Sequence, residues 1–316
     1  MKTILILGSS GLLGSELNSG KYLKEYNIIS QSLKSKTDLK INLNFFSQTT
    51  KMLEKIKPDI IINLVSLTNV DDCEKFPDKA FRSNIKTIQN LVDGIKINCP
   101  NCFLIHISTD QVYDGTDINS EKDINLANYY AYSKYIGELI ASKVKCTILR
   151  TSFFGKSRNP RRVSFTDWLY KELVQSNNIN LFDDILFNPL SLNNLCKMIE
   201  LVVEKKIQGI FNLGSNEGMS KADFGYNFAK LIKLSTLRIK RIKSSNAKFL
   251  IAYRPKNMIM NLTILMYMMK RLTARKVFSS KFIRMANVIL KILQYGERSE
   301  QRIYRTEINM YANQVT

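Results

Sequence analysis

A short apolar run near the start of the chain leads straight into a glycine turn, and this order of residues constrains the fold more than any other feature. Residues 2–7 have the length of a buried strand, Gly8, Gly11 and Gly14 follow, and apolar residues then recur with helical spacing. Strand, glycine turn and helix predict a dinucleotide-binding site, because glycines let a pyrophosphate approach backbone N–H groups. An ordinary turn is the alternative. A secretory signal is not expected, because the apolar run is too short and lacks a cleavage site.

Two further apolar runs of strand length, residues 60–65 and 103–107, are separated by stretches with helical spacing. This alternation predicts an α/β fold, a doubly wound parallel sheet with helices on both faces. With 316 residues and 45% hydrophobic content, the chain can bury a large core in one domain plus an insert.

A phenol and an ammonium lie one helical turn apart, at Tyr130 and Lys134. A nearby cation favours phenolate, so we expect Lys134 to lower the pKa of Tyr130 from about 10 and to prepare it for general acid catalysis. The same spacing occurs on ordinary solvated helix faces. The Tyr130–Lys134 pair therefore indicates a catalytic site only in combination with the glycine turn that precedes it in the chain.

Taken in order, these motifs resemble the extended short-chain dehydrogenase/reductase superfamily and, within it, the dTDP-4-dehydrorhamnose reductase family. The resemblance covers residues 1–261. Besides the glycine turn and the Tyr130–Lys134 pair, it rests on residues 58–63, 68–71, Asn84, 106–115, 149–155 and Arg254-Pro255. It implies a Rossmann-type NAD(P)-binding domain over residues 1–151 and a smaller C-terminal substrate-binding lobe over 152–261, with 187–214 returning to the first domain.

The resemblance also implies catalytic roles. Tyr130 would donate a proton to the keto oxygen of the substrate, Lys134 would hold the nicotinamide ribose, and Thr109 would hydrogen-bond the same keto oxygen. Asn84 matches a position that supports the lysine and a proton-relay water. A buried, hydrogen-bonded asparagine is the equally weighted alternative for Asn84.

Cofactor choice is expected to depend on the end of the second strand. An acidic residue there usually binds the ribose 2′-hydroxyl of NADH, but this chain has Gln31, Ser32 and Lys34, which favours NADPH with NADH as the alternative. Asn42 stands where the family typically has an adenine-contacting Asp. The implied cofactor-binding residues are Gly8, Ser10, Gly11, Leu12, Leu13, Gly14, Gln31, Ser32, Lys34, Asn42, Leu43, Leu64, Val65, Ser66, Thr68, Tyr130 and Lys134.

Four cations, Lys156, Arg158, Arg161 and Arg162, gather in seven residues of the expected lobe. They form either a solvated loop or a clamp for the diphosphate of a sugar nucleotide, for which arginine has suitable geometry. Arg254 matches a family position near the substrate phosphates. The implied substrate-binding residues are Ser108, Asp110, Val112, Tyr113, Thr151, Phe153, Arg158 and Arg254.

The chain carries 47 Lys and Arg against 27 Asp and Glu, a net charge of +20, so anionic partners must be considered. Part of the excess lies in residues 262–316, a basic, Met-rich C-terminal extension of unrecognised type. A plain helical or poorly ordered extension is expected first, and peripheral membrane or partner contact second. Nucleic-acid binding is not expected. Family reductases can use Mg²⁺ and form homodimers with acidic groups near the C-terminus, and the altered tail leaves both properties open.

Five cysteines without a disulfide framework predict reduced thiols and a cytoplasmic protein. A single histidine, His106, gives no support for a protein-bound metal site. The resemblance implies an NADPH-dependent reductase of a nucleotide-linked 4-keto sugar, first of all dTDP-4-dehydro-L-rhamnose. The alternatives are an epimerase or a reductase of another sugar nucleotide, or a non-catalytic regulatory subunit that keeps the nucleotide site.

Overall fold

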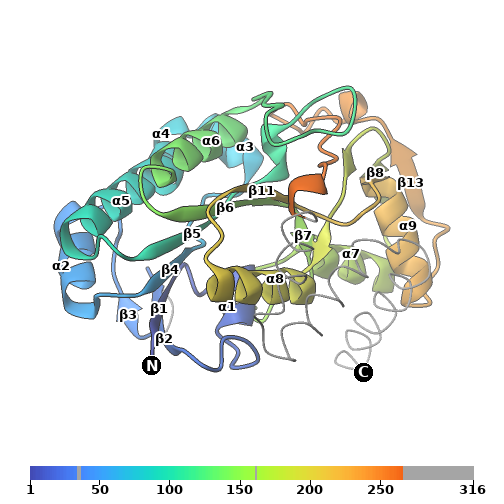
Figure 1. Cartoon of the computed structure of the whole chain (residues 1–316). Helices are drawn as coiled ribbons and strands as arrows, with labels where there is room; N and C mark the ends of the chain where they lie inside the picture. The colour runs from blue at the N-terminus through green and yellow to red at the C-terminus, as the bar shows by residue number, and fades with distance from the viewer. Residues whose placement is uncertain (34–36, 161, 266–316) are drawn as a thin grey trace.

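The computed structural model describes residues 1–33, 37–160 and 162–265 (Figure 1). Its centre is a seven-stranded sheet in the order β11-β6-β5-β4-β1-β2-β3, and every neighbouring pair in it is parallel. The strands are β1 (Thr3–Leu7), β2 (Asn27–Ser32), β3 (Leu39–Lys40), β4 (Ile60–Asn63), β5 (Phe103–Ile107), β6 (Cys146–Thr151) and β11 (Gly209–Leu213). The predicted doubly wound α/β fold is confirmed.

Successive residues of each buried strand point to opposite faces of this sheet, and each face has its own helices. Figure 1 shows α2 (Phe46–Ile56), α5 (Thr87–Asn98) and α6 (Tyr129–Ala141) on one face, and α1 (Leu12–Leu17) and α8 (Leu192–Lys205) on the other. Ile4 and Ile6 of β1 pack in the core shared with α1 and α8, whereas Leu5 and Leu7 pack in the core shared with α2 and α5. Because both faces are covered, the strands read as continuous apolar runs.

A short chain of helices links β4 to α5. α3 (Val70–Lys75) and α4 (Pro77–Ala80) lead into η1 (Phe81–Lys86), a π-helical turn that runs directly into α5. A π turn holds one more residue than an α turn, so it displaces the side chains that follow it. The turn places Asn84 against α6, beside the Tyr130–Lys134 segment.

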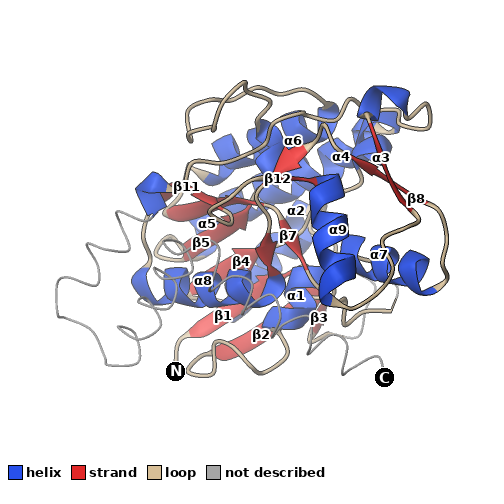
Figure 2. Ribbon diagram, turned by 90° about the vertical axis from the view of Figure 1, so that its right-hand side faces the viewer, coloured by secondary structure: helices blue, strands red, loops and turns tan. Residues whose placement is uncertain are grey.

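A second, smaller core lies to one side of the sheet and is built by residues that follow β6 (Figures 1 and 2). It contains α7 (Phe165–Val174), α9 (Lys221–Leu231) and the parallel pair β8 (Ile179–Phe182) and β13 (Ile239–Ile242). Two two-residue strand pairings accompany this core, parallel between β7 (Phe153–Phe154) and β10 (Leu190–Ser191) and antiparallel between β9 (Leu186–Phe187) and β12 (Met219–Ser220). Two isolated bridges pair Asn119 with Met260 and Leu186 with Asn257. We call this smaller core and its elements the smaller lobe. Its first elements, α7 to β9, and its later elements, β12 to β13, are separated in the chain by α8 and by β11, the edge strand of the large sheet.

The last described segment returns to the main core. Asn188 exchanges two hydrogen bonds with the backbone of Met260, at 3.1 and 3.2 Å, and Met260, Leu262 and Leu265 are buried with α8. Residues 266–316, most of the predicted basic extension, lie outside the described residues. Among the helices that the structure does describe, none combines the length and the apolar character needed to cross a lipid bilayer.

Candidate active site

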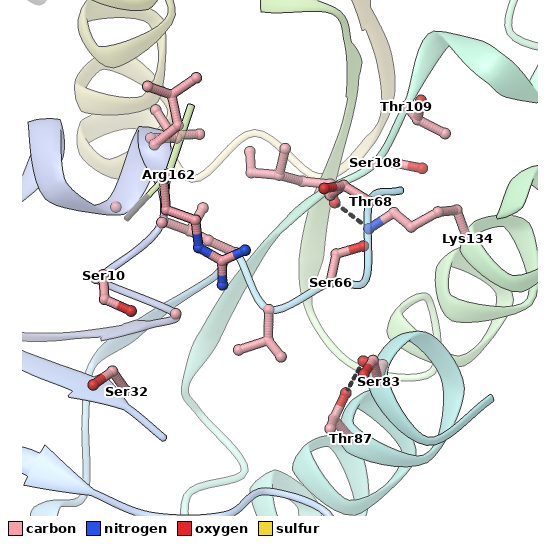
Figure 3. Close-up of a pocket in the computed structure, with 18 of the residues that line it drawn as sticks. Ser10, Ser32, Ser66, Thr68, Ser83, Thr87, Ser108, Thr109, Lys134 and Arg162 are labelled. Carbon is pink, nitrogen blue, oxygen red and sulfur yellow. Dashed lines mark hydrogen bonds between the residues drawn. The ribbon is translucent and has the colours of Figure 1, made fainter. Parts of the chain in front are cut away.

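A cavity of about 560 Å³ opens along the carboxyl ends of the parallel strands, which is where ligands bind in doubly wound sheets. Its volume falls within the range of small-molecule sites. Figure 3 shows side chains from the glycine turn, the strand ends and α6 converging on it. Sequence-predicted residues that line it are Gly8, Ser10, Gly11, Leu12, Leu13, Gly14, Gln31, Ser32, Asn42, Leu43, Leu64, Val65, Ser66, Thr68, Ser108, Thr109, Asp110, Tyr130, Lys134, Thr151 and Phe153.

The glycine turn at one end of the cavity requires its glycines. Gly8 has a φ of +77°, a conformation that side chains disfavour. A Cβ on Gly14 would lie 2.5 Å from the carbonyl oxygen of Gly8, so any side chain there would push α1 away from the turn. The tight, bare backbone leaves room for a pyrophosphate close to the turn. These residues therefore fit a dinucleotide.

At the other end of the cavity, the first turn of α6 meets the end of β5. Asn128 begins α6 by accepting a hydrogen bond from the Ala131 N–H at 2.8 Å, which places Tyr130 in the first helical turn and Lys134 one turn later. The Lys134 Nζ donates to the Ile107 carbonyl at 2.7 Å, and Thr109 hydrogen-bonds the Tyr130 side chain. Three of the four side chains predicted to be catalytic, those of Tyr130, Lys134 and Thr109, are therefore together at the cavity.

The pKa of Tyr130 differs from the expectation. Burial raises it above its usual value, against a smaller opposing effect of the Thr109 hydrogen bond, and the predicted lowering by Lys134 is not found in this state. Burial also lowers the pKa of Lys134 itself to about 8, so the ammonium is costly to keep here without an anion. A phenol with a raised pKa keeps its proton at neutral pH and gives it up only to a strongly basic oxygen.

A fully buried polar network lies behind the end of β5. Arg150 of β6 binds both carboxylate oxygens of Glu138 on α6, with the closest contact at 2.6 Å, and each side chain is only 1% exposed. Glu138 also accepts a hydrogen bond from Ser108, the residue before Thr109. The network fixes the strand end and α6 relative to one another, and so holds Thr109 near Tyr130.

Two predicted substrate-binding residues belong to this interior, and their predicted role does not fit their positions. The Tyr113 hydroxyl donates to Asn212 at 2.6 Å and accepts from Arg150 at 2.8 Å, which uses its hydrogen-bonding capacity. Val112 is packed in the main core. Neither side chain lines the cavity, because the short helix η2 (Asp110–Val112) turns the chain inward after Gln111.

Asn84 lies behind the cavity wall. Its amide oxygen accepts from the Leu67 N–H at 2.8 Å and from the Ser66 hydroxyl at 3.0 Å, while its amide nitrogen donates to Ser133 at 2.9 Å. These bonds correspond to the alternative of a buried, hydrogen-bonded asparagine. They also connect the loop after β4 to α6, next to Lys134. The proton-relay role stays a prediction.

The two arginines predicted to bind substrate are paired with carboxylates of the protein. Arg254 binds Asp71 through two hydrogen bonds of 2.8 and 3.0 Å, which joins two of the motifs that carry the resemblance. Arg158 binds Glu16 of α1. Neither lines the cavity, so a direct contact with substrate phosphates requires that these pairs rearrange.

At the end of the cavity where the adenosine of a dinucleotide is expected, two polar side chains already make hydrogen bonds within the protein. The Gln31 amide bridges the Gly8 N–H, at 3.2 Å, and the Ile41 carbonyl. Asn42 accepts from the Asn44 N–H at 3.1 Å and so forms a local turn. Both residues line the cavity, and in the structure they shape it through these bonds. Lys34, predicted to meet a 2′-phosphate, lies outside the described residues.

Two cations near the cavity were not assigned by the sequence analysis. Lys221 begins α9, its Nζ lies 3.3 Å from the centre of the Phe187 ring, and its charge opposes the rise in the pKa of Asp110, which burial brings to about 6. No motif marks Lys221. Arg162 lines the cavity from the loop before α7, and the sequence showed it only as one member of a cluster of cations.

A glycine turn after the first strand, a doubly wound sheet and a Tyr–Lys–Thr constellation at its carboxyl edge define an NAD(P)-dependent oxidoreductase of the extended short-chain dehydrogenase/reductase class. A family model described as RmlD substrate binding domain matches residues 1–277. The chain belongs to this family.

Several known proteins are similar to the chain. The probable low-salt glycan biosynthesis reductase Agl14 of Haloferax volcanii is 27% identical over 61% of this chain and 66% of its own length, just under two thirds. The dTDP-4-dehydrorhamnose reductase of Aggregatibacter actinomycetemcomitans is 27% identical over 66% of this chain and 70% of its own length. The structure of dTDP-4-dehydrorhamnose reductase from Bacillus anthracis in complex with NADP matches with a TM-score of 0.77 at 24% identity, over 91% of this chain and 98% of that one, which shows the shared fold.

Proposed function

We propose that the chain catalyses the NADPH-dependent reduction of a nucleotide-linked 4-keto sugar, with dTDP-4-dehydro-L-rhamnose as the first substrate to test and dTDP-L-rhamnose as its product. One observation carries the proposal. Tyr130, Thr109 and Lys134 meet at one end of a cavity whose other end is the glycine turn. A dinucleotide bound along this cavity would present its nicotinamide beside the three side chains.

The chemistry follows from the placement of these groups. A bound nicotinamide supplies the hydride that forms the new C–H bond. As the carbonyl π electrons move to oxygen, Tyr130 transfers its proton there and Thr109 hydrogen-bonds the same atom. Donors aimed at a developing negative charge stabilise the transition state more than the ground state. Lys134 lies one turn from the phenolate that results and offsets its charge.

The buried environment of Tyr130 supports this role. Its raised pKa keeps the proton on the phenol in the resting enzyme, and the alkoxide that develops in the transition state is basic enough to take it. The Glu138–Arg150 pair supports Thr109 through Ser108, so the two donors are held in place before substrate arrives.

The test compares Tyr130→Phe with Tyr132→Phe, a matched control on the exposed face of the same helix, where Tyr132 is 46% exposed. With dTDP-4-dehydro-L-rhamnose as substrate, the absorbance of NADPH reports turnover. We expect Tyr130→Phe to lower kcat by about 10²–10⁴-fold and to change the Kd for NADPH by less than about twofold, and Tyr132→Phe to behave like the parent.

Unchanged turnover in Tyr130→Phe would remove the catalytic assignment. A parent protein that binds NADPH but does not turn over this sugar would redirect the search to another sugar nucleotide, to an epimerase reaction, or to a regulatory subunit.

A further inference from the structure

One segment of the smaller lobe lies over the glycine turn of the large sheet and is attached to it. The Asn159 amide donates to the Ser10 carbonyl at 2.8 Å, and Arg158 binds Glu16 on α1. Ser157 is attached to the lobe itself, because its N–H donates to Asp167 of α7 at 3.1 Å. Residues 157–159 therefore fasten the lobe to the edge of the cavity at the glycine turn.

Arg162 follows on this segment and lines the cavity. Figure 3 shows its guanidinium projecting into the open space between Ser10 of the glycine turn and Ser66 after β4. Among the described residues, no carboxylate pairs with it and no acceptor takes a hydrogen bond from its side chain. Its three neighbours in the cluster of cations differ from it: Arg158 has a carboxylate partner, Lys156 is already engaged in an interaction, and Arg161 is outside the described residues.

A guanidinium is charged at every accessible pH and offers a planar set of donors that matches two phosphate oxygens. Because no carboxylate among the described residues balances it, the guanidinium adds a positive charge to the cavity that an anionic ligand would balance. The part of the cavity that it faces lies next to Gly8, Gly11 and Gly14, which have no side chains of their own.

We propose that Arg162 binds the diphosphate of the nicotinamide dinucleotide, so that the smaller lobe supplies a cofactor ligand to the large sheet. This assignment replaces the expected clamp for the sugar nucleotide at this residue. It rests on the proposed function only in that the cavity takes a nicotinamide dinucleotide. Arg158 and Asn159 are positioning residues, because they hold the segment that carries Arg162.

Equilibrium titrations of NADPH and NADH fluorescence with the full-length protein test the assignment without any sugar substrate. Arg162→Gln removes the charge but keeps a polar side chain. Arg238→Gln is the control, because Arg238 is exposed and precedes β13 in the smaller lobe, remote from the cavity lining. Both dinucleotides carry the diphosphate, whereas only NADPH carries a 2′-phosphate.

We expect Arg162→Gln to raise the Kd for NADPH and for NADH by a similar factor, about tenfold or more, since charge-assisted hydrogen bonds are the strong ones. Arg238→Gln should leave both constants within about twofold. The melting temperature of the ligand-free Arg162→Gln protein should match the parent, because the side chain has no partner among the residues described.

Weaker binding of NADPH alone would overturn the diphosphate assignment and make Arg162 a ligand of the 2′-phosphate. Unchanged binding of both dinucleotides would overturn any contact with the cofactor. If the parent itself binds neither dinucleotide, the proposed function fails together with this inference, whereas binding by the parent with no effect of Arg162→Gln leaves the proposed function standing.

Discussion

The residues that carry the chemistry owe their properties to burial, which spacing along a helix does not reveal. The sequence correctly brought Tyr130 and Lys134 to one helix face next to Thr109, because positions four apart share a face. The predicted lowering of the Tyr130 pKa was wrong, because the pKa is raised. Desolvation of the buried phenol raises its pKa by more than the Thr109 hydrogen bond lowers it, and the degree of burial depends on how α6 packs on the sheet.

Packing in the fold also explains why Arg158 and Arg162 have different surroundings. In the sequence, Arg158 and Arg162 are equivalent members of one cluster of cations. Only the fold shows that Glu16 of α1 meets Arg158 and that Arg162 faces the cavity. Val112 and Tyr113 lie away from the cavity for a related reason, since η2 turns them into the core directly after residues 107–111, which line it.

Lys134 leads to a prediction on pH. Its pKa is lowered to about 8, so in the free protein the ammonium is present below about pH 8 and lost above it. An anionic cofactor binds the charged form better, so affinity for NADPH should be constant below about pH 8 and fall above it, by up to about tenfold per pH unit. Fluorescence titrations from neutral to alkaline pH at constant ionic strength measure this dependence.

Two variants control for general charge effects in that experiment. Lys134→Gln should bind more weakly at neutral pH and lose most of the dependence, while Lys143→Gln, an exposed lysine after α6, should keep it. The same slope in Lys134→Gln as in the parent would assign the titration to another group.

At the scale of elements, the sequence predicted the parallel strands and the glycine turn well, because buried strands and bare turns have strong local signals. The π turn η1 (Phe81–Lys86) has no such signal. Its residues have ordinary helical spacing, and only contact with the loop after β4 and with α6 explains the extra residue. Asn84 is the side chain that joins these three elements.

We therefore predict that Asn84→Ala destabilises the protein by about 1–3 kcal/mol, because it leaves the partly buried Leu67 N–H without its acceptor and removes the amide that donates to the Ser133 hydroxyl. Chemical denaturation would measure the change. Lys86→Ala in the same turn is exposed and should cost less than about 0.5 kcal/mol. A loss in Asn84→Ala as small as in that control would contradict the structural role. The rate per folded molecule, measured separately, would then test the predicted support of Lys134.

At the scale of the whole molecule, residues far apart in the chain complete the main core. The resemblance was drawn up to residue 261, but Leu262 and Leu265 are 7% and 2% exposed and pack against α8. The composition of the tail could not reveal this, because two leucines in a Met-rich, basic segment have no distinctive periodicity. The main core therefore includes Leu262 and Leu265, two residues of the predicted extension.

A version that ends at residue 261 should be less stable than one that ends at 265, by about 3–6 kcal/mol for the two buried leucines. Thermal unfolding followed by circular dichroism would compare the two. The version ending at 265 should also bind NADPH, since every described residue that lines the cavity precedes its end. Equal melting temperatures would show that Leu262 and Leu265 add little to the core.

The pairing of β11 with β6 also sets the order of events during synthesis. The dinucleotide-binding sheet cannot be finished when β6 leaves the ribosome, because its edge is covered only by β11, which follows α7, β8 and α8 in the chain. At cellular rates of elongation, that edge of the nascent chain stays open for roughly 3–12 s. An unpaired, apolar strand edge is a site for wrong pairing, so the nascent chain is open to mispairing during this interval.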